Sequence, residues 1–154
     1  AQLNATGSAA LRYDAAVLLE EAIALSNATL GSFDVTIAPL VALWNISGDD
    51  PRVPAQEKID ALLPLVGSEH IHLSGGNATL DEGCAIDLGG IAKGFASDRI
   101  AQLYHESDLS GGFVSLGGNV YVHGENTDGE KWNVAIQHPE VSGGYACMLS
   151  LTDA

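Results

Sequence analysis

Residues 85–98 are the stretch whose residue types and spacing best suit ligand binding, because they combine a carboxylate, a glycine pair and a lysine. Asp87 ends an apolar run, the pair Gly89-Gly90 follows it, and Lys93 stands in the helical pattern after them. Adjacent glycines let a ligand approach the backbone without meeting a Cβ, and a helix start offers unpaired amides at its positive end. Asp87 could accept a hydrogen bond from a hydroxyl or a ring nitrogen, and Lys93 could meet a phosphate. An ordinary turn whose glycines only permit close packing explains the spacing equally well, and the glycines match neither the dinucleotide fingerprint nor a P-loop.

A second stretch, residues 31–44, places polar and aromatic side chains between two predicted helices. Ser32, Phe33 and Asp34 follow a glycine and could form one wall of a pocket. The simpler explanation of this stretch, taken alone, is a connection between helices with Phe33 and Trp44 in the core.

A third stretch holds a glycine pair between two predicted strands. Gly117 and Gly118 separate the apolar runs 113–116 and 119–123. Such a pair indicates a bulge or a close backbone contact, and a plain hairpin turn accounts for it nearly as well.

The hydrophobic pattern predicts helices in the first part of the chain and hairpins in the second. Helical spacing covers 14–29, with Asp14 as the predicted N-cap, then 39–44, a helix opened by Pro54, and 91–104. Strands are predicted at 70–73, 78–80, 84–88, 113–116, 119–123, 132–136 and 145–151. Residues up to 13 are predicted to be a loop. This order favours an α+β fold with N-terminal helices packed on a largely antiparallel sheet, and a single domain over 1–154.

Composition limits the classes of ligand. The chain has 154 residues, a net charge of −14 and only six Lys and Arg, which argues against nucleic acid. An acidic protein that handles phosphate must use backbone amides, a helix N-terminus or a metal ion. No apolar run reaches the length of a membrane span.

Two histidines, His70 and His72, fall on one face of a predicted strand and could bind zinc. No third ligand is evident in the sequence, so a partly exposed pair on a strand is the simpler interpretation.

Taken in their order along the chain, the stretches 31–44, 85–98 and 114–120, followed by 132–139, resemble the FAD:protein FMN transferases of the ApbE family. The resemblance covers about residues 19–139. It rests on four patterns, G-x-F-D-x-T-x-x-P-L-x-x-L-W, D-L-G-x-I-A-K-G-x-x-x-D, a G-G-x turn and W-x-V-x-I-x-x-P. The fold that it implies is part of an ApbE-like domain, related to the T-fold.

The resemblance implies magnesium-dependent transfer of FMN from FAD to a Thr or Ser of an acceptor flavoprotein, with release of AMP. Hydrolysis of the FAD pyrophosphate and flavin binding without chemistry are the alternatives. The implied FAD contacts are Ser32, Phe33, Asp34 and Asp87, with Lys93, Gly117 and Gly118 near the phosphates. The backbone carbonyl of Gly90 is the implied magnesium ligand. A metal on the phosphates would supply the positive charge that the side chains lack.

The resemblance also carries expectations about the whole protein. We expect the chain to lack both ends of the family domain, and the catalytic histidine to lie beyond its C-terminus. We therefore expect this chain to be inactive by itself. The resemblance further implies a full-length protein on the extracytoplasmic side of a bacterial membrane, periplasmic or lipid-anchored. The oligomeric state is left open, with a homodimer among the options.

Overall fold

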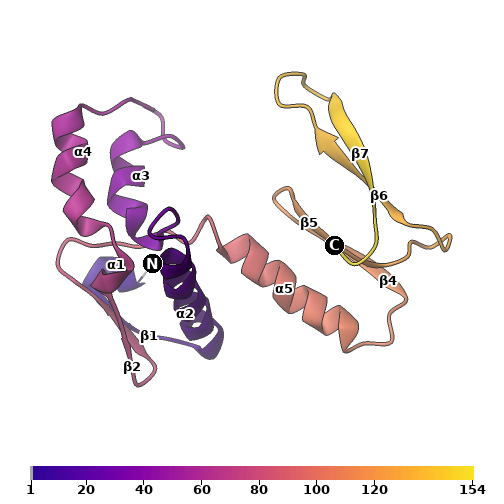
Figure 1. Ribbon diagram of the computed structural model, residues 1–154, viewed down its shortest axis with the longest axis horizontal. Coiled ribbons are helices and arrows are strands. Elements are labelled where there is room, and N and C mark those ends of the chain that lie inside the picture. The colour runs from indigo at the N-terminus through magenta and orange to yellow at the C-terminus, as the bar shows by residue number, and fades with distance from the viewer. Residues whose placement is uncertain (1) are drawn as a thin grey trace. The chain divides into compact units, whose positions relative to one another are not determined.

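The computed structural model describes residues 2–154, which form two compact units (Figure 1). The first unit ends at Ile91 and the second runs from Ala92 to Ala154. Each unit has its own helical and antiparallel strand elements. No helix within residues 2–154 combines the length and the apolar character needed to cross a membrane.

The first unit surrounds a small sheet with helices. Its elements are α1 (Gln2–Thr6), β1 (Ser8–Ala10), α2 (Tyr13–Ala28), η1 (Val35–Ile37), α3 (Ala38–Trp44), α4 (Gln56–Leu62), η2 (Leu63–Leu65), η3 (Ser68–His70), β2 (Ile71–Ser74) and β3 (Asn77–Leu80). The three strands are antiparallel, in the order β1-β3-β2. The prediction of a loop up to residue 13 was wrong, because α1 and β1 lie there. β1 pairs with β3, 69 residues further along the chain at Ala9 and Ala78, so a local pattern could not reveal it.

Helix α2 ends next to the functional stretch of residues 31–44. It begins at Tyr13 after the extended Arg12, so Asp14 is a first-turn residue and the predicted N-cap was wrong. A carboxylate in that turn still stabilises the positive end of the helix. At the other end the Gly31 amide donates to the Ser26 carbonyl at 2.9 Å, and Gly31 has φ +77°. This bond and this backbone conformation are those of a glycine that terminates a helix.

The hairpin β2-β3 confirms the predicted strand pair but tightens its turn. Ser74 pairs with Asn77, which leaves Gly75 and Gly76 as the two turn residues. Both have positive φ, +56° and +78°, the conformation that a type I′ hairpin turn requires at both positions. The predicted loop of four residues was therefore too long.

Residues 84–88 form no strand, and that prediction was wrong. The segment is extended but pairs with isolated groups rather than with another strand. The Asp87 amide donates to the Val35 carbonyl at 2.7 Å, and the Ile86 backbone bonds to the side chain of Asn4. Ile86 and Leu88 also pack against two clusters of buried residues, which explains the strand-like apolar pattern. These clusters are Leu3, Ala9, Leu19 and Ala78, and Ala22, Val35 and Ile71.

The second unit consists of one helix and two hairpins. Its elements are α5 (Ala92–His105), β4 (Gly111–Leu116), β5 (Asn119–Gly124), β6 (Trp132–Gln137) and β7 (Tyr145–Leu151). β4 pairs with β5 and β6 with β7, both antiparallel. The predicted helix and all four strands are confirmed within two residues. The antiparallel arrangement is confirmed as well, as three small sheets in the chain rather than one large sheet.

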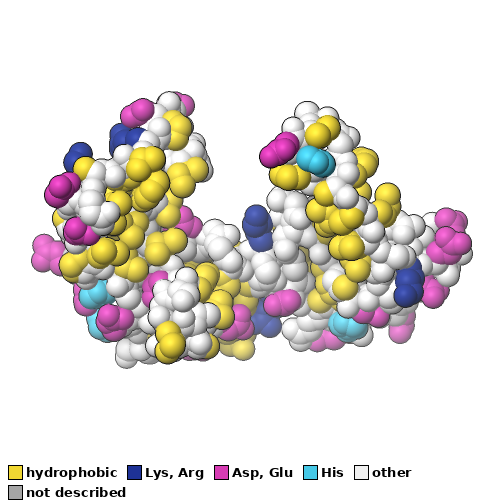
Figure 2. Space-filling view, turned by 45° about the horizontal axis from the view of Figure 1, so that its top comes forward, with side chains coloured by type: hydrophobic (Ala, Val, Ile, Leu, Met, Phe, Trp, Pro, Cys, Tyr) yellow, Lys and Arg dark blue, Asp and Glu magenta, His cyan; other side chains and the backbone are white. Residues whose placement is uncertain are grey.

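Side chains of one kind gather on parts of this surface (Figure 2). Hydrophobic side chains cover the region of α3 and α4, where Val41 and Ile46 are 40% and 71% exposed. Acidic side chains are scattered over both units and far outnumber basic ones, in agreement with the net charge of −14.

Candidate functional site

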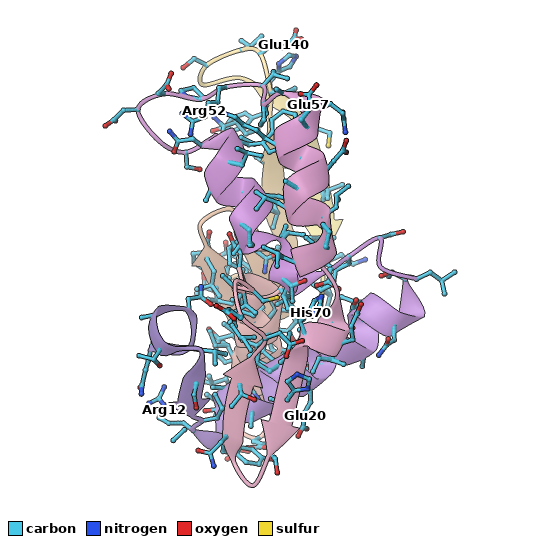
Figure 3. The ribbon with its side chains drawn as sticks, turned by 90° about the vertical axis from the view of Figure 1, so that its left-hand side faces the viewer. Arg12, Glu20, Arg52, Glu57, His70 and Glu140 are labelled. Atoms are coloured by element: carbon cyan, nitrogen blue, oxygen red, sulfur yellow. The ribbon has the colours of Figure 1, made fainter. Side chains whose placement is uncertain are left out.

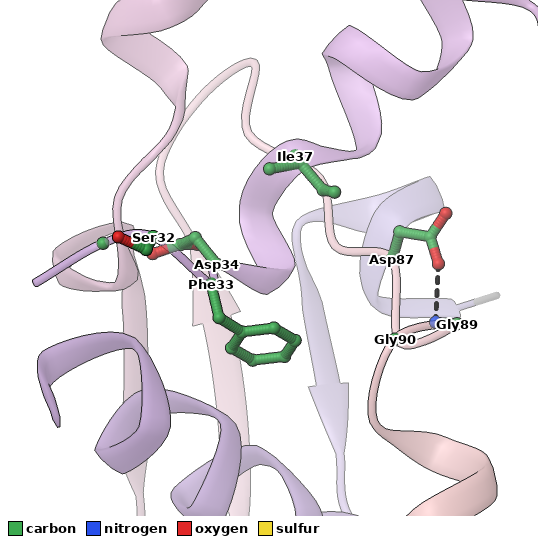
Figure 4. A pocket seen from close by; sticks show the side chains of 8 residues that line it. Ser32, Phe33, Asp34, Ile37, Asp87, Gly89 and Gly90 are labelled. Carbon is green, nitrogen blue, oxygen red and sulfur yellow. Dashed lines mark hydrogen bonds between the residues drawn. The ribbon is translucent and has the colours of Figure 1, made fainter. Parts of the chain in front are cut away.

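An open pocket of about 350 Å³ lies within the first unit (Figure 4). It is lined by two segments that are distant in sequence, Gly31, Ser32, Phe33, Asp34 and Ile37 from the first and Asp87, Gly89 and Gly90 from the second. The hydrogen bond from the Asp87 amide to the Val35 carbonyl, 2.7 Å long, joins the two segments. The structure thus brings together, around one pocket, five residues that the family resemblance assigned to FAD or magnesium: residues 32–34, Asp87 and Gly90.

The carboxylate of Asp34 is turned into the protein. It is 7% exposed, and it accepts hydrogen bonds from the Ser26 hydroxyl at 2.5 Å and from the Thr36 amide and hydroxyl at 2.8 and 2.5 Å. Burial alone would raise the pKa of Asp34, but the bonds from Ser26 and Thr36 outweigh it and hold that pKa below its ordinary value. Asp34 also caps η1. Its main role in the structure is to fix the loop, and a direct contact with FAD stays a prediction.

The end of α2 holds the other residues of the first wall. Thr29 Oγ1 donates to the Leu25 carbonyl at 2.9 Å and accepts from the Phe33 amide at 3.1 Å. The Ser32 amide donates to the Thr29 carbonyl at 3.1 Å. These bonds determine the backbone of Ser32 and Phe33, while Figure 4 shows the Phe33 ring between the two walls.

The second wall is a tight turn that exposes its backbone. Asp87 Oδ1 accepts from the Gly89 amide at 2.7 Å, as the dashed line in Figure 4 shows, and the Ile91 amide donates to the Leu88 carbonyl at 3.1 Å. Within the part of the chain that the structure describes, no donor bonds to Asp87 Oδ2. One carboxylate oxygen therefore holds the turn and the other can accept from a ligand.

Space at Gly90 is limited on the side of the aromatic ring. A Cβ built on Gly90 would stand 3.2 Å from Phe33 Cε2, so an alanine would require a small shift of the ring. The carbonyl of Gly90 and the carboxylate of Asp87 are oxygen donors of the type that magnesium prefers. Among residues 2–154, however, no group of three His, Cys, Asp or Glu side chains could hold a metal ion. The oxygen donors suit magnesium in kind, and phosphate and water oxygens would have to complete its ligands.

Lys93, Gly117 and Gly118 belong to the second unit. Asn119 Nδ2 donates to Ser97 Oγ at 2.9 Å and reaches the Lys93 carbonyl at 3.5 Å. Within that unit the glycine turn before Asn119 therefore lies beside the first turn of α5. Gly117 and Gly118 have φ of +59° and +92°, the conformation of a hairpin turn. Their proximity to phosphate stays a prediction.

Several residues that support the pocket were not selected from the sequence. Thr36 is fully buried and its hydroxyl also accepts from the Gly67 amide at 2.7 Å, so it connects the first wall to a third segment. The spacing of Asp34 and Thr36 could have indicated a local side-chain bond to the backbone two residues on. Nothing in the sequence near Ser26 or Thr29 indicates their partners, which the fold supplies.

Comparison with known proteins yields one family along the whole chain. The family model described as the ApbE family matches residues 1–154. An FAD:protein FMN transferase of Vibrio cholerae is 35% identical over 128 residues, which cover 80% of this chain and 38% of that protein. Proteins of the same name from Haemophilus influenzae and Treponema pallidum are 33% and 32% identical and cover 84% and 93% of this chain, and 40% and 45% of their own lengths.

Solved structures agree with this result. The ApbE protein of Thermotoga maritima has a TM-score of 0.84 with 28% identity, over 99% of this chain and 51% of that chain. The flavin transferase ApbE of Vibrio cholerae has a TM-score of 0.76 with 32% identity, over 94% of this chain and 48% of that chain. The chain spans about two fifths of the length of the curated relatives and about half of these solved chains. By its sequence and by its fold, the chain belongs to the ApbE family.

Proposed function

We propose that the chain carries the FAD-binding part of an FAD:protein FMN transferase. The relatives that bear this name support the proposal, and so does a pocket built from the two motifs that the family resemblance rests on. The observation that carries it is the turn at Asp87, Gly89 and Gly90, which combines a free carboxylate oxygen with accessible backbone.

The character of this pocket suits one section of a dinucleotide. Phe33 and Ile37 provide apolar contact, while Asp87 can accept from a ring nitrogen or a ribose hydroxyl. A volume of about 350 Å³ holds only part of FAD, so the remainder of the ligand would lie outside the pocket. The side chains of the pocket bring no positive charge, which leaves the diphosphate to backbone amides or to a metal ion.

In the proposed reaction, the hydroxyl of an acceptor Thr or Ser attacks the phosphorus of the FMN half of FAD. The new phosphoester bond forms, the bond between that phosphorus and the bridging oxygen of the diphosphate breaks, and AMP leaves with that oxygen. The hydroxyl proton passes to a base. A bound magnesium ion would neutralise charge on the phosphate oxygens. The residues of this chain that would contribute are Asp87, which orients FAD, and the Gly90 carbonyl, which would contact the metal.

We also propose that this chain alone binds FAD without completing the transfer. The supporting observation is the lack of a metal-ligating cluster among the described residues.

FAD hydrolysis, transfer and plain binding are distinguished by incubating the chain with FAD, magnesium and an acceptor peptide. A peptide gain of one FMN, seen by mass spectrometry, would show transfer, and release of FMN and AMP would show hydrolysis. An extracytoplasmic location of the full-length protein belongs to the same proposal.

Titration calorimetry tests the binding proposal directly. We expect FAD and AMP to bind the chain, with FAD gaining affinity from magnesium. The change Asp87→Ala removes an acceptor and loosens the turn, and we expect it to weaken FAD binding by about tenfold or more, in line with the roughly 1.5–3 kcal/mol of a hydrogen bond to a charged group. Asp60→Ala on α4 is the matched control, because the Asp60 carboxylate accepts from Gln56 on the same helix and does not line the pocket. Absence of FAD binding with and without magnesium would refute the proposal.

A further inference from the structure

The side chain of Asn4 bonds to the backbone of a single distant residue, Ile86. Asn4 Nδ2 donates to the Ile86 carbonyl at 2.8 Å, and Asn4 Oδ1 accepts from the Ile86 amide at 2.9 Å. The two residues are 82 positions apart. We propose that Asn4 is a positioning residue for the FAD pocket, in that it fixes the segment from which Asp87 and the glycine turn project.

The segment around Ile86 depends on these bonds because no neighbouring strand supplies them. In extended backbone the polar groups of successive residues point to opposite sides. Here the Asn4 side chain bonds to both the amide and the carbonyl of Ile86 on one side, and the Val35 carbonyl accepts from the Asp87 amide on the other. Ile86 is partly buried, and backbone groups that lack partners are costly where water reaches them poorly, so Asn4 replaces the missing strand partner. Ile86, which these bonds hold, directly precedes Asp87, the first pocket-lining residue of the second wall.

Asn4 is itself held in place by the core. It lies in α1, where the preceding Leu3 is 7% exposed and packs with Ala9, Leu19 and Ala78. The Gly7 amide donates to the Leu3 carbonyl at 2.9 Å and closes the helix. Leu3 therefore anchors a helix of five residues, and the neighbouring side chain reaches the pocket segment.

The chemistry of an amide makes the inference specific. Asparagine carries one donor and one acceptor side by side, as a peptide group does. Aspartate has the same shape, but in its ionised form it offers a second acceptor to the Ile86 carbonyl instead of a donor. When protonated, aspartate regains a donor. The change Asn4→Asp should therefore impair the pocket at neutral pH and restore it in part at acidic pH.

The experiment compares FAD affinity at pH 7.5 and pH 5, and it rests on the proposed function. Asn4→Ala removes both bonds to Ile86, and Asn4→Asp places an acceptor against the Ile86 carbonyl, so both variants should bind FAD about tenfold or more weakly at pH 7.5. For Asn4→Asp the FAD affinity relative to the wild type should recover in part at pH 5, where a carboxyl beside the Ile86 carbonyl begins to take up a proton, and for Asn4→Ala it should not recover. Asn77→Asp is the control, because Asn77 Nδ2 bonds to Gly75 in the hairpin turn, and its ratio should stay constant. A ratio near one for both Asn4 variants at pH 7.5 would overturn the inference.

Hydrogen exchange of the chain without FAD provides a second test, which needs no ligand. The Ile86 amide should exchange slowly, because Asn4 holds it, and Asn4→Asp should accelerate Ile86 and Gly89 together. Exchange of the Ile86 amide at the rate of an exposed loop would overturn the inference. If exchange is slow but the wild type binds no FAD, the proposed function fails while the anchoring role of Asn4 stands.

Discussion

The arrangement around Asp34 shows how single residues shape the pocket. The Thr36 hydroxyl donates a hydrogen bond to Asp34 and accepts one from the Gly67 amide, so one side chain connects two segments. The family pattern selected Asp34 as a ligand contact, yet its carboxylate is satisfied by Ser26 and Thr36. A motif records that a residue type is required. It does not tell whether the requirement comes from a ligand or from the fold.

The change Thr36→Val tests the structural part of this role. Valine keeps the shape but leaves Asp34 and the Gly67 amide each short of a bond in a buried site. We expect the free energy of unfolding to fall by about 1–3 kcal/mol, measured by urea denaturation. The exposed Thr79→Val on β3 is the control and should remain within about 0.5 kcal/mol of the wild type. Equal effects of the two changes would contradict the assigned role.

Both ring nitrogens of His70, a residue labelled in Figure 3, lie close to acceptor atoms. Nδ1 lies 2.9 Å from Asp81 Oδ2 and Nε2 lies 3.1 Å from the Pro64 carbonyl. Only the protonated ring can donate to both. His72 Nε2 bonds to the other oxygen of Asp81 at 2.8 Å, so the histidine pair suggested for zinc is engaged by one carboxylate. The hydrogen bond to Asp81, helped by the charge of Glu69, raises the pKa of His70 above its ordinary value of 6.5.

The raised pKa of His70 predicts a dependence of stability on pH. The stabilisation should be fully present below pH 6.5 and be lost as the pH rises through the folded-state pKa. Proton NMR should show His70 titrating at a higher pH in the folded chain than in urea. The change His70→Gln should remove this part of the pH dependence of unfolding, while His72→Gln should leave most of it. A folded-state midpoint at or below 6.5 would contradict the prediction.

At the scale of elements, the sequence predicts regular periods well and long-range pairing badly. The second unit follows its predicted helix and strands because each hairpin strand has its partner nearby in sequence. α1 and β1 were missed because five and three residues carry no measurable period. The strand predicted at 84–88 was wrong for a different reason. Ile86 and Leu88 are apolar because they pack against the core, and the backbone partners are the Asn4 side chain and Val35, the first residue of η1.

Two glycines with different surroundings make a prediction about elements. Gly76 has φ +78° in the β2-β3 turn, so Gly76→Ala should destabilise the first unit by roughly 1–2 kcal/mol. Gly94 lies within α5 with nothing near its Cβ position, so Gly94→Ala should stabilise that helix by about 0.8–1 kcal/mol. Thermal unfolding followed by circular dichroism should show opposite shifts for the two variants. A lower melting temperature for Gly94→Ala would indicate that the helix needs the glycine for its packing.

For the whole molecule, the division of the chain is the result that sequence patterns did not indicate. The boundary between the units falls between Ile91 and Ala92, inside the motif that begins at Asp87. The pocket needs only the part of this motif before the boundary, while Lys93 stands after it. The assignment of 1–154 to one domain stays a prediction. Family membership, in contrast, could be predicted from the motifs, because long specific patterns can be recognised in a sequence even where its tertiary contacts cannot be predicted.

The net charge makes a prediction about the rate of FAD binding. At −14 the molecule repels an anionic dinucleotide at long range, and the Debye length shortens from about 30 Å at 0.01 M to about 8 Å at 0.15 M salt. Raising potassium chloride over that range should increase the association rate of FAD, measured by stopped-flow flavin fluorescence. Uncharged riboflavin should show no comparable increase. A fall in the FAD rate would mean that local amide dipoles outweigh the overall field.

The bond between Asn4 and Ile86 has a consequence for how the protein is made. During synthesis Asn4 leaves the ribosome long before Ile86, so the side chain of Asn4 can bond to its partner only after most of this unit has been made. Contacts so far apart in sequence slow folding, because a long loop has to close first. We therefore expect the wall that carries Asp87 to be among the last regions of this unit to acquire its native shape during synthesis.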